Sequence, residues 1–117
     1  MDAKPAHFGA MVGERDGQIA VIFASRRTGE DDAGYVRAAA RMADLAARQP
    51  GYAGLESVRD SDGDGITISY WNDAASAAAW RDHPEHVRIR ELGRARWYDS
   101  YTVTVATVTR GYRWNRT

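Results

Sequence analysis

The run 19–25 is apolar on both of its alternating faces. Its β-branched and aromatic side chains predict a β-strand. One face carries Ile19, Val21 and Phe23, and the other carries Ala20, Ile22 and Ala24. A strand that is apolar on both sides must be covered on both sides, so we expect a sheet whose two faces are both buried here.

The strongest helical pattern in the chain covers 31–49. Acidic residues stand at its start, and Pro50 and Gly51 end it. One face of this helix carries Tyr35, Ala39, Met42 and Ala46. The arginines of the segment lie largely away from that face, which is the pattern of a helix packed on one side.

The remaining elements follow from alternation, capping residues and turns. Alternating side chains predict strands over 52–60 and 66–71, joined by a turn over 60–65 whose Asp-Gly steps favour a hairpin. Asn72 or Asp73 begins a short alanine-rich helix that ends near Arg81, and a second helical piece covers 83–95. A β-branched alternation predicts the last strand over 101–108. The order β-α-β-β-α-β predicts a ferredoxin-like α+β domain with a four-stranded antiparallel sheet.

This arrangement bears on how the chain assembles. Its helices cover only one face of the sheet, yet the first strand is apolar on both. A second copy of the chain, packed sheet against sheet, would cover the other face, so we predict a homodimer. We assign 19–114 to the domain, 1–18 to an N-terminal extension and 115–117 to a C-terminal tail.

Composition removes several classes of function. The chain has no cysteine, which excludes disulfides and thiolate chemistry. Sixteen basic residues balance sixteen acidic ones, so no net charge favours nucleic acid or an anionic membrane surface. The sequence has no run of 18 apolar residues and no apolar leader segment. We therefore expect a cytoplasmic protein with neither a nucleic-acid nor a membrane partner.

Two groups of residues resemble parts of metal sites. The turn Asp60-x-Asp62-x-Asp64 begins like a calcium loop, but Trp71 stands where the loop needs its closing glutamate. His83 and His86 are three residues apart at a helix start, and no third protein ligand is near them in the sequence. We predict no metal site.

The strongest candidates for chemistry are His86 and a set of aromatic residues. His86 shares a helix face with Ile89, Gly93 and Trp97, so it is either a satisfied core group or a residue of a pocket. The chain has four tryptophans. An aromatic cavity for a flat ligand would draw on Tyr70, Trp80, Trp97 and Tyr101, and the alternative is that they fill the core and the dimer interface.

Several segments together resemble the antibiotic biosynthesis monooxygenase family. They read YWNDAA at 70–75, AWRDHPEH at 79–86 and GRARWYDSY at 93–101, with AVIF at 20–23 and QPGY at 49–52. The resemblance runs from about Ile19 to Trp114. It implies a dimeric α/β-barrel, in which two ferredoxin-like subunits pack their sheets back to back and each holds a ligand cavity between sheet and helices.

The resemblance also implies alternative functions. The leading one is a cofactor-independent monooxygenase, in which His86 accepts the proton of a phenol or quinol bound by Tyr70, Trp80, Trp97 and Tyr101. The second is a haem-binding or haem-degrading enzyme with His86 as axial ligand, although Ala24 and Ser25 stand where haem-degrading relatives carry an asparagine. The third is a dimeric module that binds a small molecule, or serves a stress response, without catalysis.

Overall fold

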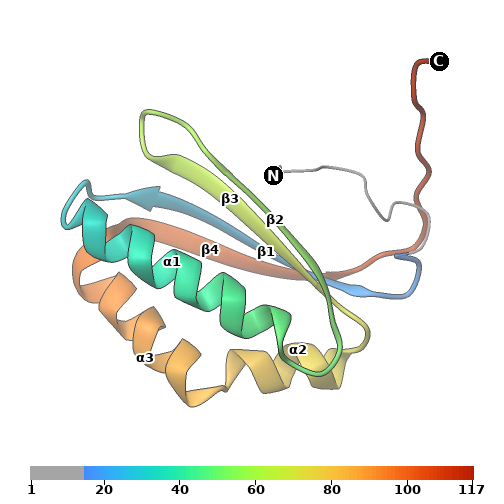
Figure 1. Cartoon of the computed structure of the whole chain (residues 1–117), viewed down its shortest axis with the longest axis horizontal. Helices are drawn as coiled ribbons and strands as arrows, with labels where there is room; N and C mark the ends of the chain where they lie inside the picture. Colours follow the sequence, from blue (N-terminus) through green and yellow to red (C-terminus); the bar gives the residue numbers. More distant parts are fainter. Residues whose placement is uncertain (1–14) are drawn as a thin grey trace.

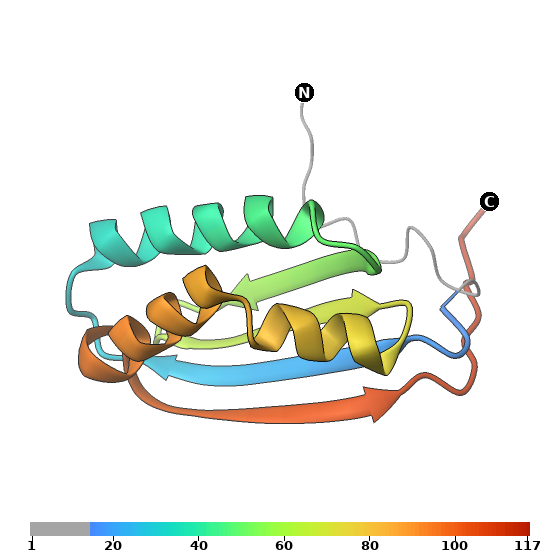
Figure 2. The ribbon, with the colours of Figure 1, turned by 90° about the horizontal axis from the view of Figure 1, so that it is seen from below.

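The computed structural model describes residues 15–117, which form one four-stranded sheet with helices on one side (Figures 1 and 2). The elements are β1 (Ile19–Arg27), α1 (Asp32–Ala47), β2 (Tyr52–Arg59), β3 (Asp64–Trp71), α2 (Ala74–Arg81), α3 (Pro84–Leu92), the π-helical turn η1 (Gly93–Trp97) and β4 (Tyr98–Thr107). The expected β-α-β-β-α-β order and α+β class are confirmed. The N-terminal extension predicted over 1–18 lies outside the described residues as far as residue 14.

The sheet has the strand order β2-β3-β1-β4, and all its pairs are antiparallel. β1 lies in the interior, where Ile22 stands opposite Ile68 of β3 and Thr104 of β4. The helices cover one face of this sheet (Figure 2). The doubly apolar first strand is therefore a central strand, and one of its faces is turned away from the helices.

The core of the domain lies between the sheet and the helices. Trp71 of β3 is fully buried against Trp80 of α2 and Ala46 of α1. Partly buried apolar side chains surround these three: Ile19, Val21, Met42, Leu45, Tyr52 and Ala77. The helix face predicted from the spacing of Met42 and Ala46 is thus the face that packs on the sheet.

The opposite face of the sheet, which we call the open face, carries apolar side chains with no helix of residues 15–117 over them. Strand register assigns its members, because residues directly opposite one another in a pair share a face. They are Ala20, Ile22 and Ala24 of β1, Ile66, Ile68 and Tyr70 of β3, and Val58 of β2. Val58 is 53% exposed and Ile66 is 45% exposed. Such a patch is typical of a surface that another molecule covers.

Most element boundaries differ from the sequence prediction by one to three residues, and three of these differences have a clear cause. The helix expected over 83–95 ends at Leu92 and continues as η1, and β4 begins at Tyr98 rather than at 101. A side chain at Gly93 would come within 2.9 Å of the Tyr98 ring, so the close packing of this turn depends on glycine. β3 begins at Asp64, two residues early, because Asp64 already pairs with Arg26 of β1.

Residues 108–117 follow β4 without regular secondary structure. Val108 is still tied to the start of β1, through backbone hydrogen bonds with Gly17 and Gln18 of 2.8 and 2.9 Å. Beyond it the chain leaves the sheet on the side away from the helices (Figure 1). Within 15–117, no helix is both long and apolar enough to cross a membrane.

Candidate active site

His86 lies against Trp80, six residues earlier, where the chain turns between α2 and α3. Asp82 ends α2, and His83 caps α3 by accepting the N–H of Glu85 at 3.2 Å. This sharp turn lays the His86 ring flat on the Trp80 indole, with ring centroids 4.4 Å apart and planes 10° from parallel. Nδ1 of His86 is 2.9 Å from the Trp80 carbonyl oxygen. The imidazole is thus fixed both by stacking and by a hydrogen bond.

This hydrogen bond determines the tautomer of His86. A carbonyl oxygen only accepts, so Nδ1 must donate its proton, and in the neutral ring Nε2 then carries the free lone pair. Within residues 15–117, no hydrogen bond engages Nε2. Burial lowers the pKa of His86 below its ordinary value, which favours the neutral ring at neutral pH. The side chain is therefore a pre-oriented base with one nitrogen unused.

The surroundings of His86 are aromatic. Trp80 stacks on Trp71 with ring centroids 6.2 Å apart, and Tyr52 meets Trp71 edge-on at 5.8 Å. The Trp71 indole N–H donates to the Ser69 hydroxyl at 3.0 Å, so its one polar atom is satisfied. We call this group of His86, Trp80, Trp71 and Tyr52 the tryptophan end of the helix-covered layer.

The other end of the same layer, which we call the arginine end, is also aromatic but polar. Tyr35 of α1 meets the rings of Trp97 and Tyr98 edge-on at 6.0 and 5.9 Å. The indole N–H of Trp97 donates to the Asp31 carboxylate at 3.2 Å. Phe23 lies 5.0 Å from the Tyr101 ring, which links this end to β1.

Two arginines lie on either side of the Tyr35 ring. The guanidinium carbons of Arg27 and Arg59 are 4.1 and 5.5 Å from its centroid. Arg27 pairs with the Asp32 carboxylate at 2.9 Å. Arg59 instead donates to the Ser25 and Tyr35 hydroxyls, at 2.6 and 3.3 Å, and has no carboxylate partner among residues 15–117. The residues singled out from the sequence did not include this cluster.

One signal in the sequence pointed to the arginine end. The Arg59 side chain crosses β3 at Gly65, where an added Cβ would lie 2.6 Å from the guanidinium carbon. A glycine inside a strand marks such a close approach. Burial and the neighbouring Tyr35 hydroxyl raise the pKa of the Tyr98 phenol well above its ordinary value, so this hydroxyl keeps its proton.

The structure brings together only some of the residues expected to form a site. Trp80 and His86 are in contact at the tryptophan end, whereas Trp97 and Tyr101 lie at the arginine end. Tyr70 is on the open face, where its hydroxyl donates to Glu56 at 3.2 Å and Arg15 stacks on its ring at 3.7 Å. The sheet therefore separates Tyr70 from the other four.

β4 carries two apolar side chains on the helix side that no helix within 15–117 covers. Val105 stands opposite Val21, which packs against the core, and Val103 stands opposite Phe23. Both β4 valines therefore face the helix side, yet Val103 is 53% exposed and Val105 is 63% exposed. The helices leave this edge of the sheet accessible.

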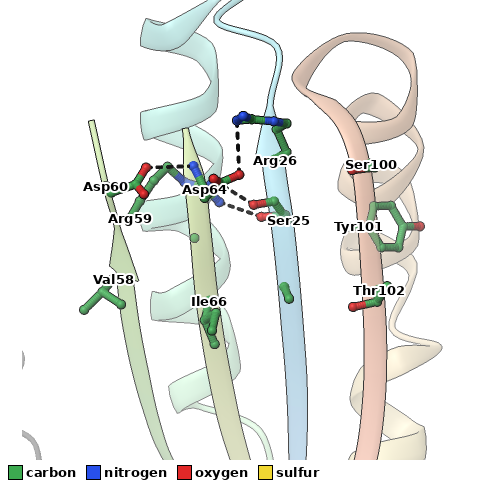
Figure 3. A pocket seen from close by; sticks show the side chains of 12 residues that line it. Ser25, Arg26, Val58, Arg59, Asp60, Asp64, Ile66, Ser100, Tyr101 and Thr102 are labelled. Carbon is green, nitrogen blue, oxygen red and sulfur yellow. Dashed lines mark hydrogen bonds and ion pairs between the residues drawn. The ribbon is translucent and has the colours of Figure 1, made fainter. Parts of the chain in front are cut away.

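Two of the hollows on the surface of residues 15–117 bear on the candidate site. The larger, about 820 Å³, lies on the open face over the strand ends and is bordered by Arg26, Asp60 and Asp64 (Figure 3). The smaller, about 250 Å³, is bordered by Pro50, Ser76 and the edge of Trp80. In the part of the chain that the structure describes, no three His, Asp or Glu side chains gather as a metal site would require.

The fold defines a class: a ferredoxin-like domain with helices on one face of an antiparallel sheet and an opposite face that no element within 15–117 covers. Residues 18–92 match the family described as antibiotic biosynthesis monooxygenase (ABM). The chain belongs to this family, so the resemblance stated from the sequence is confirmed.

Individual relatives agree with this assignment. The Bacillus subtilis (strain 168) protein YqjZ, described as uncharacterized, is 53% identical over 91 residues, covering 78% of this chain and 79% of that protein. SnoaB of Streptomyces nogalater, a cofactor-independent oxygenase, matches with a TM-score of 0.68 at 20% identity over 79% of this chain and 93% of SnoaB. A conserved protein from Methanosarcina mazei Go1 matches with a TM-score of 0.73 at 9% identity, over 81% and 96% of the two chains. At these identities the two solved structures show the fold alone.

Proposed function

We propose that the protein is a cofactor-independent monooxygenase for a flat phenol or quinol, with His86 as the catalytic base. The supporting observation is the state of His86: Nδ1 is held by the Trp80 carbonyl, burial lowers the pKa, and Nε2 is unused within 15–117. A general base needs such an unprotonated nitrogen in a fixed direction. Membership of a monooxygenase family and likeness in fold to SnoaB support the same reaction class.

The substrate lies on the helix side of β4 in this proposal. Val103 and Val105 offer an exposed apolar surface beside Phe23, and a flat aromatic ring gains by covering it. In this proposal Trp80 closes one end of the bound substrate's surroundings, and Trp97 and Tyr101 close the other. Tyr70 takes no part in binding this substrate, because it lies on the open face.

The chemistry needs no electrons from outside the substrate. Nε2 of His86 takes the phenolic proton, and the resulting electron-rich anion reacts at carbon with O₂. Loss of water from the hydroperoxide then leaves a quinone-type carbonyl, so an activated CH₂ plus O₂ gives C=O plus H₂O. One oxygen atom enters the product, and the substrate supplies the electrons that reduce the other. His86 returns its proton in the step that releases water.

The active form is a homodimer in this proposal. The open face carries Ile22, Ile66, Ile68 and Val58 without cover from any described element. Because a second copy presents the same apolar face, a twofold pair of sheets buries both patches. Light scattering at micromolar concentration should give twice the chain mass, and a single-chain mass would contradict this part of the proposal.

Oxygen uptake with a panel of polycyclic phenols and quinols tests the reaction. His86→Ala should lower turnover about 10²–10⁴-fold, the usual range for losing a general base. His83→Ala is the matched control, since it removes a neighbouring imidazole that is already used as a helix cap. Unchanged turnover in His86→Ala would end the assignment. A wild-type protein that binds quinols without consuming oxygen would favour the non-catalytic binding module.

Haem binding is the second candidate, because a free Nε2 also suits an axial ligand. The residues fit a haem-degrading site only in part. Ala24 of the first strand points to the open face, and the Ser25 hydroxyl is already engaged by Arg59 at 2.6 Å. Titration with hemin, followed at the Soret band, tests this candidate. Saturable binding of one hemin per chain that His86→Ala abolishes would place haem chemistry first.

A further inference from the structure

The segment 108–117, which we call the arginine–aromatic segment, exposes large apolar side chains. Tyr112 is 86% exposed and Trp114 is 70% exposed. Three arginines alternate with them: Arg110, Arg113 and Arg116. Exposed tryptophan and tyrosine next to arginine is the composition of an interface centre, because these residues are enriched there and contribute most of its binding energy.

The hollow on the open face has the complementary chemistry. Its floor includes Val58 and Ile66, which are among the most exposed apolar residues of the sheet. Asp60 and Asp64 border it (Figure 3). Asp62 lies between them in the sequence, in the same turn. Its arginines are already engaged, Arg26 by Asp64 at 3.1 Å and Arg59 by Ser25 at 2.6 Å. The hollow thus offers an apolar floor and a border on which two arginines and two aspartates balance, with the carboxylate of Asp62 in the turn beside it.

The two features lie at opposite ends of the same sheet. The segment departs where β4 ends, and the hollow lies where β4 begins, at Ser100 and Thr102. The segment also rises on the open-face side, pointing away from the helices (Figure 1). To reach the hollow of its own chain, it would have to reverse at Val108 and run back along β4.

In a pair of copies, the segment of one chain can lie beside the hollow of the other. A twofold axis between the stacked sheets, perpendicular to the strands, turns the second copy end for end. Its hollow then faces the segment of the first copy, and the first copy's hollow faces the segment of the second. From Val108 to Trp114 the extended chain spans roughly 20 Å, enough to cross from one sheet to the other, since stacked sheets lie about 10 Å apart.

We propose that the arginine–aromatic segment of each copy docks in the open-face hollow of the other. Tyr112 and Trp114 cover Val58 and Ile66, and Arg113 and Arg116 face Asp60 and Asp62. This exchange rests on the two-copy assembly of the proposed function. It adds a reciprocal contact that fixes which way round the two sheets pack.

Cysteine cross-linking tests the exchange directly, because the natural chain has no cysteine. One preparation carries Val58→Cys and the other, with a mass tag, carries Trp114→Cys. After mixing, subunit exchange and mild oxidation, a disulfide between positions 58 and 114 should join a tagged chain to an untagged one. Val36→Cys with Trp114→Cys is the control, since Val36 is 63% exposed but lies on α1, behind the sheet. That pair should not cross-link.

The outcomes separate the exchange from the assembly on which it rests. A dimer by light scattering with no 58–114 link overturns the exchange alone. A third preparation carries Val58→Cys and Trp114→Cys in the same chain. A 58–114 link formed within single chains of this double variant also overturns the exchange, since the segment then folds back on its own sheet. A single-chain mass overturns both proposals.

Affinity gives a second measurement that needs no cross-link. Changing both Tyr112 and Trp114 to serine should raise the dimer dissociation constant about tenfold or more, as expected when two aromatic anchors are lost. The exposure of both residues makes a folding defect in this variant unexpected. An unchanged dissociation constant would contradict the docking.

Discussion

The tryptophan end and the arginine end occupy the same layer between sheet and helices, but different forces hold them. At the first, Trp71 is 0% exposed and packs against Trp80 and Tyr52, so burial of apolar surface dominates. At the second, Arg27 and Arg59 flank Tyr35 and bind hydroxyls, carbonyls and one carboxylate. The tryptophan end is stabilised mainly by burial of apolar surface, and the arginine end mainly by hydrogen bonds and ion pairs.

The two ends therefore affect the structure in different ways. The dry end lowers the pKa of His86 and keeps the ring neutral. The polar end joins segments that are far apart in sequence: Arg27 donates to the Trp97 carbonyl, and Arg59 crosses from β2 to Ser25 of β1. One end thus keeps the imidazole neutral, while the other end fixes the chain around the aromatic rings.

The largest expected effect is on the tryptophan end. Trp71→Ala should lower the free energy of unfolding by about 3–5 kcal/mol, because it removes the largest fully buried side chain. Val36→Ala, on the outer surface of α1, should change it by less than about 0.5 kcal/mol. Urea unfolding followed by far-ultraviolet circular dichroism measures both. A Trp71→Ala variant as stable as Val36→Ala would show that burial does not dominate this end.

The arginine end should respond less strongly. Arg59→Met keeps the aliphatic stem but removes the donors to Ser25 and Tyr35, and it should cost about 1.5–3 kcal/mol, as for hydrogen bonds made by a charged group. Arg26→Met is the matched control on the open face of the same sheet. It breaks an ion pair with Asp64 whose two side chains are both about half exposed, which is worth about 0–1 kcal/mol. Equal losses in the two variants would contradict a structural role for the Arg59 contacts.

A smaller effect is expected at Asp31, which caps α1 in a left-handed conformation with a φ of 53°. Its carboxylate accepts from the Gly34 N–H and from the Trp97 indole. Asp31→Ala should lower the melting temperature more than Asp31→Asn, since asparagine keeps an acceptor and tolerates this φ. Tryptophan fluorescence should shift in Asp31→Ala as Trp97 loses its partner. Identical melting curves for the two variants would exclude the capping role.

The smallest effect is the pH dependence that His86 confers. Its pKa is lower in the folded chain than in the unfolded one, so the unfolded chain binds the extra proton first. The resulting stability is complete above the unfolded value of about 6.5 and is lost as pH falls through the folded value. His86→Gln should flatten the change in unfolding free energy between pH 7 and 5, and His83→Gln is the control. If the unfolding free energy of His86→Gln still changed with pH as in the unmodified protein, the pH dependence would come from another group.

Much of the fold could be predicted from local pattern. The apolar run at 19–25 predicted a strand, which is β1, and the spacing of Met42 and Ala46 predicted the buried face of α1. The turn at Gly93–Trp97 could not be predicted in this way, because a π-helical hydrogen-bond pattern has no distinctive residue composition. Its close packing against Tyr98 depends on a contact between two elements.

The site was predictable only in part. The contact between His86 and Trp80 arises from the bend at Asp82, which the capping residues indicated, although the stacking itself did not follow from spacing. The position of Tyr70 was available from the sequence, since neighbouring residues of a strand point to opposite faces and Trp71 belongs to the core. The contacts of Arg59 join β2 to Ser25 of β1 and to Tyr35 of α1, which are far apart in the sequence. Only the glycine at position 65 of β3 indicated a close approach there.

The π-helical turn at Gly93–Trp97 also has a consequence for the length of the chain. Such a turn holds one residue more than an α-helical turn between the same two ends. Losing one residue from 94–96 would therefore leave an ordinary α-helical turn with both of its ends in place. Trp97 would stay beside Asp31 and Tyr35, and β4 would keep its register with β1. The turn is thus a point at which the chain can lose one residue while the sheet and the arginine end keep their geometry.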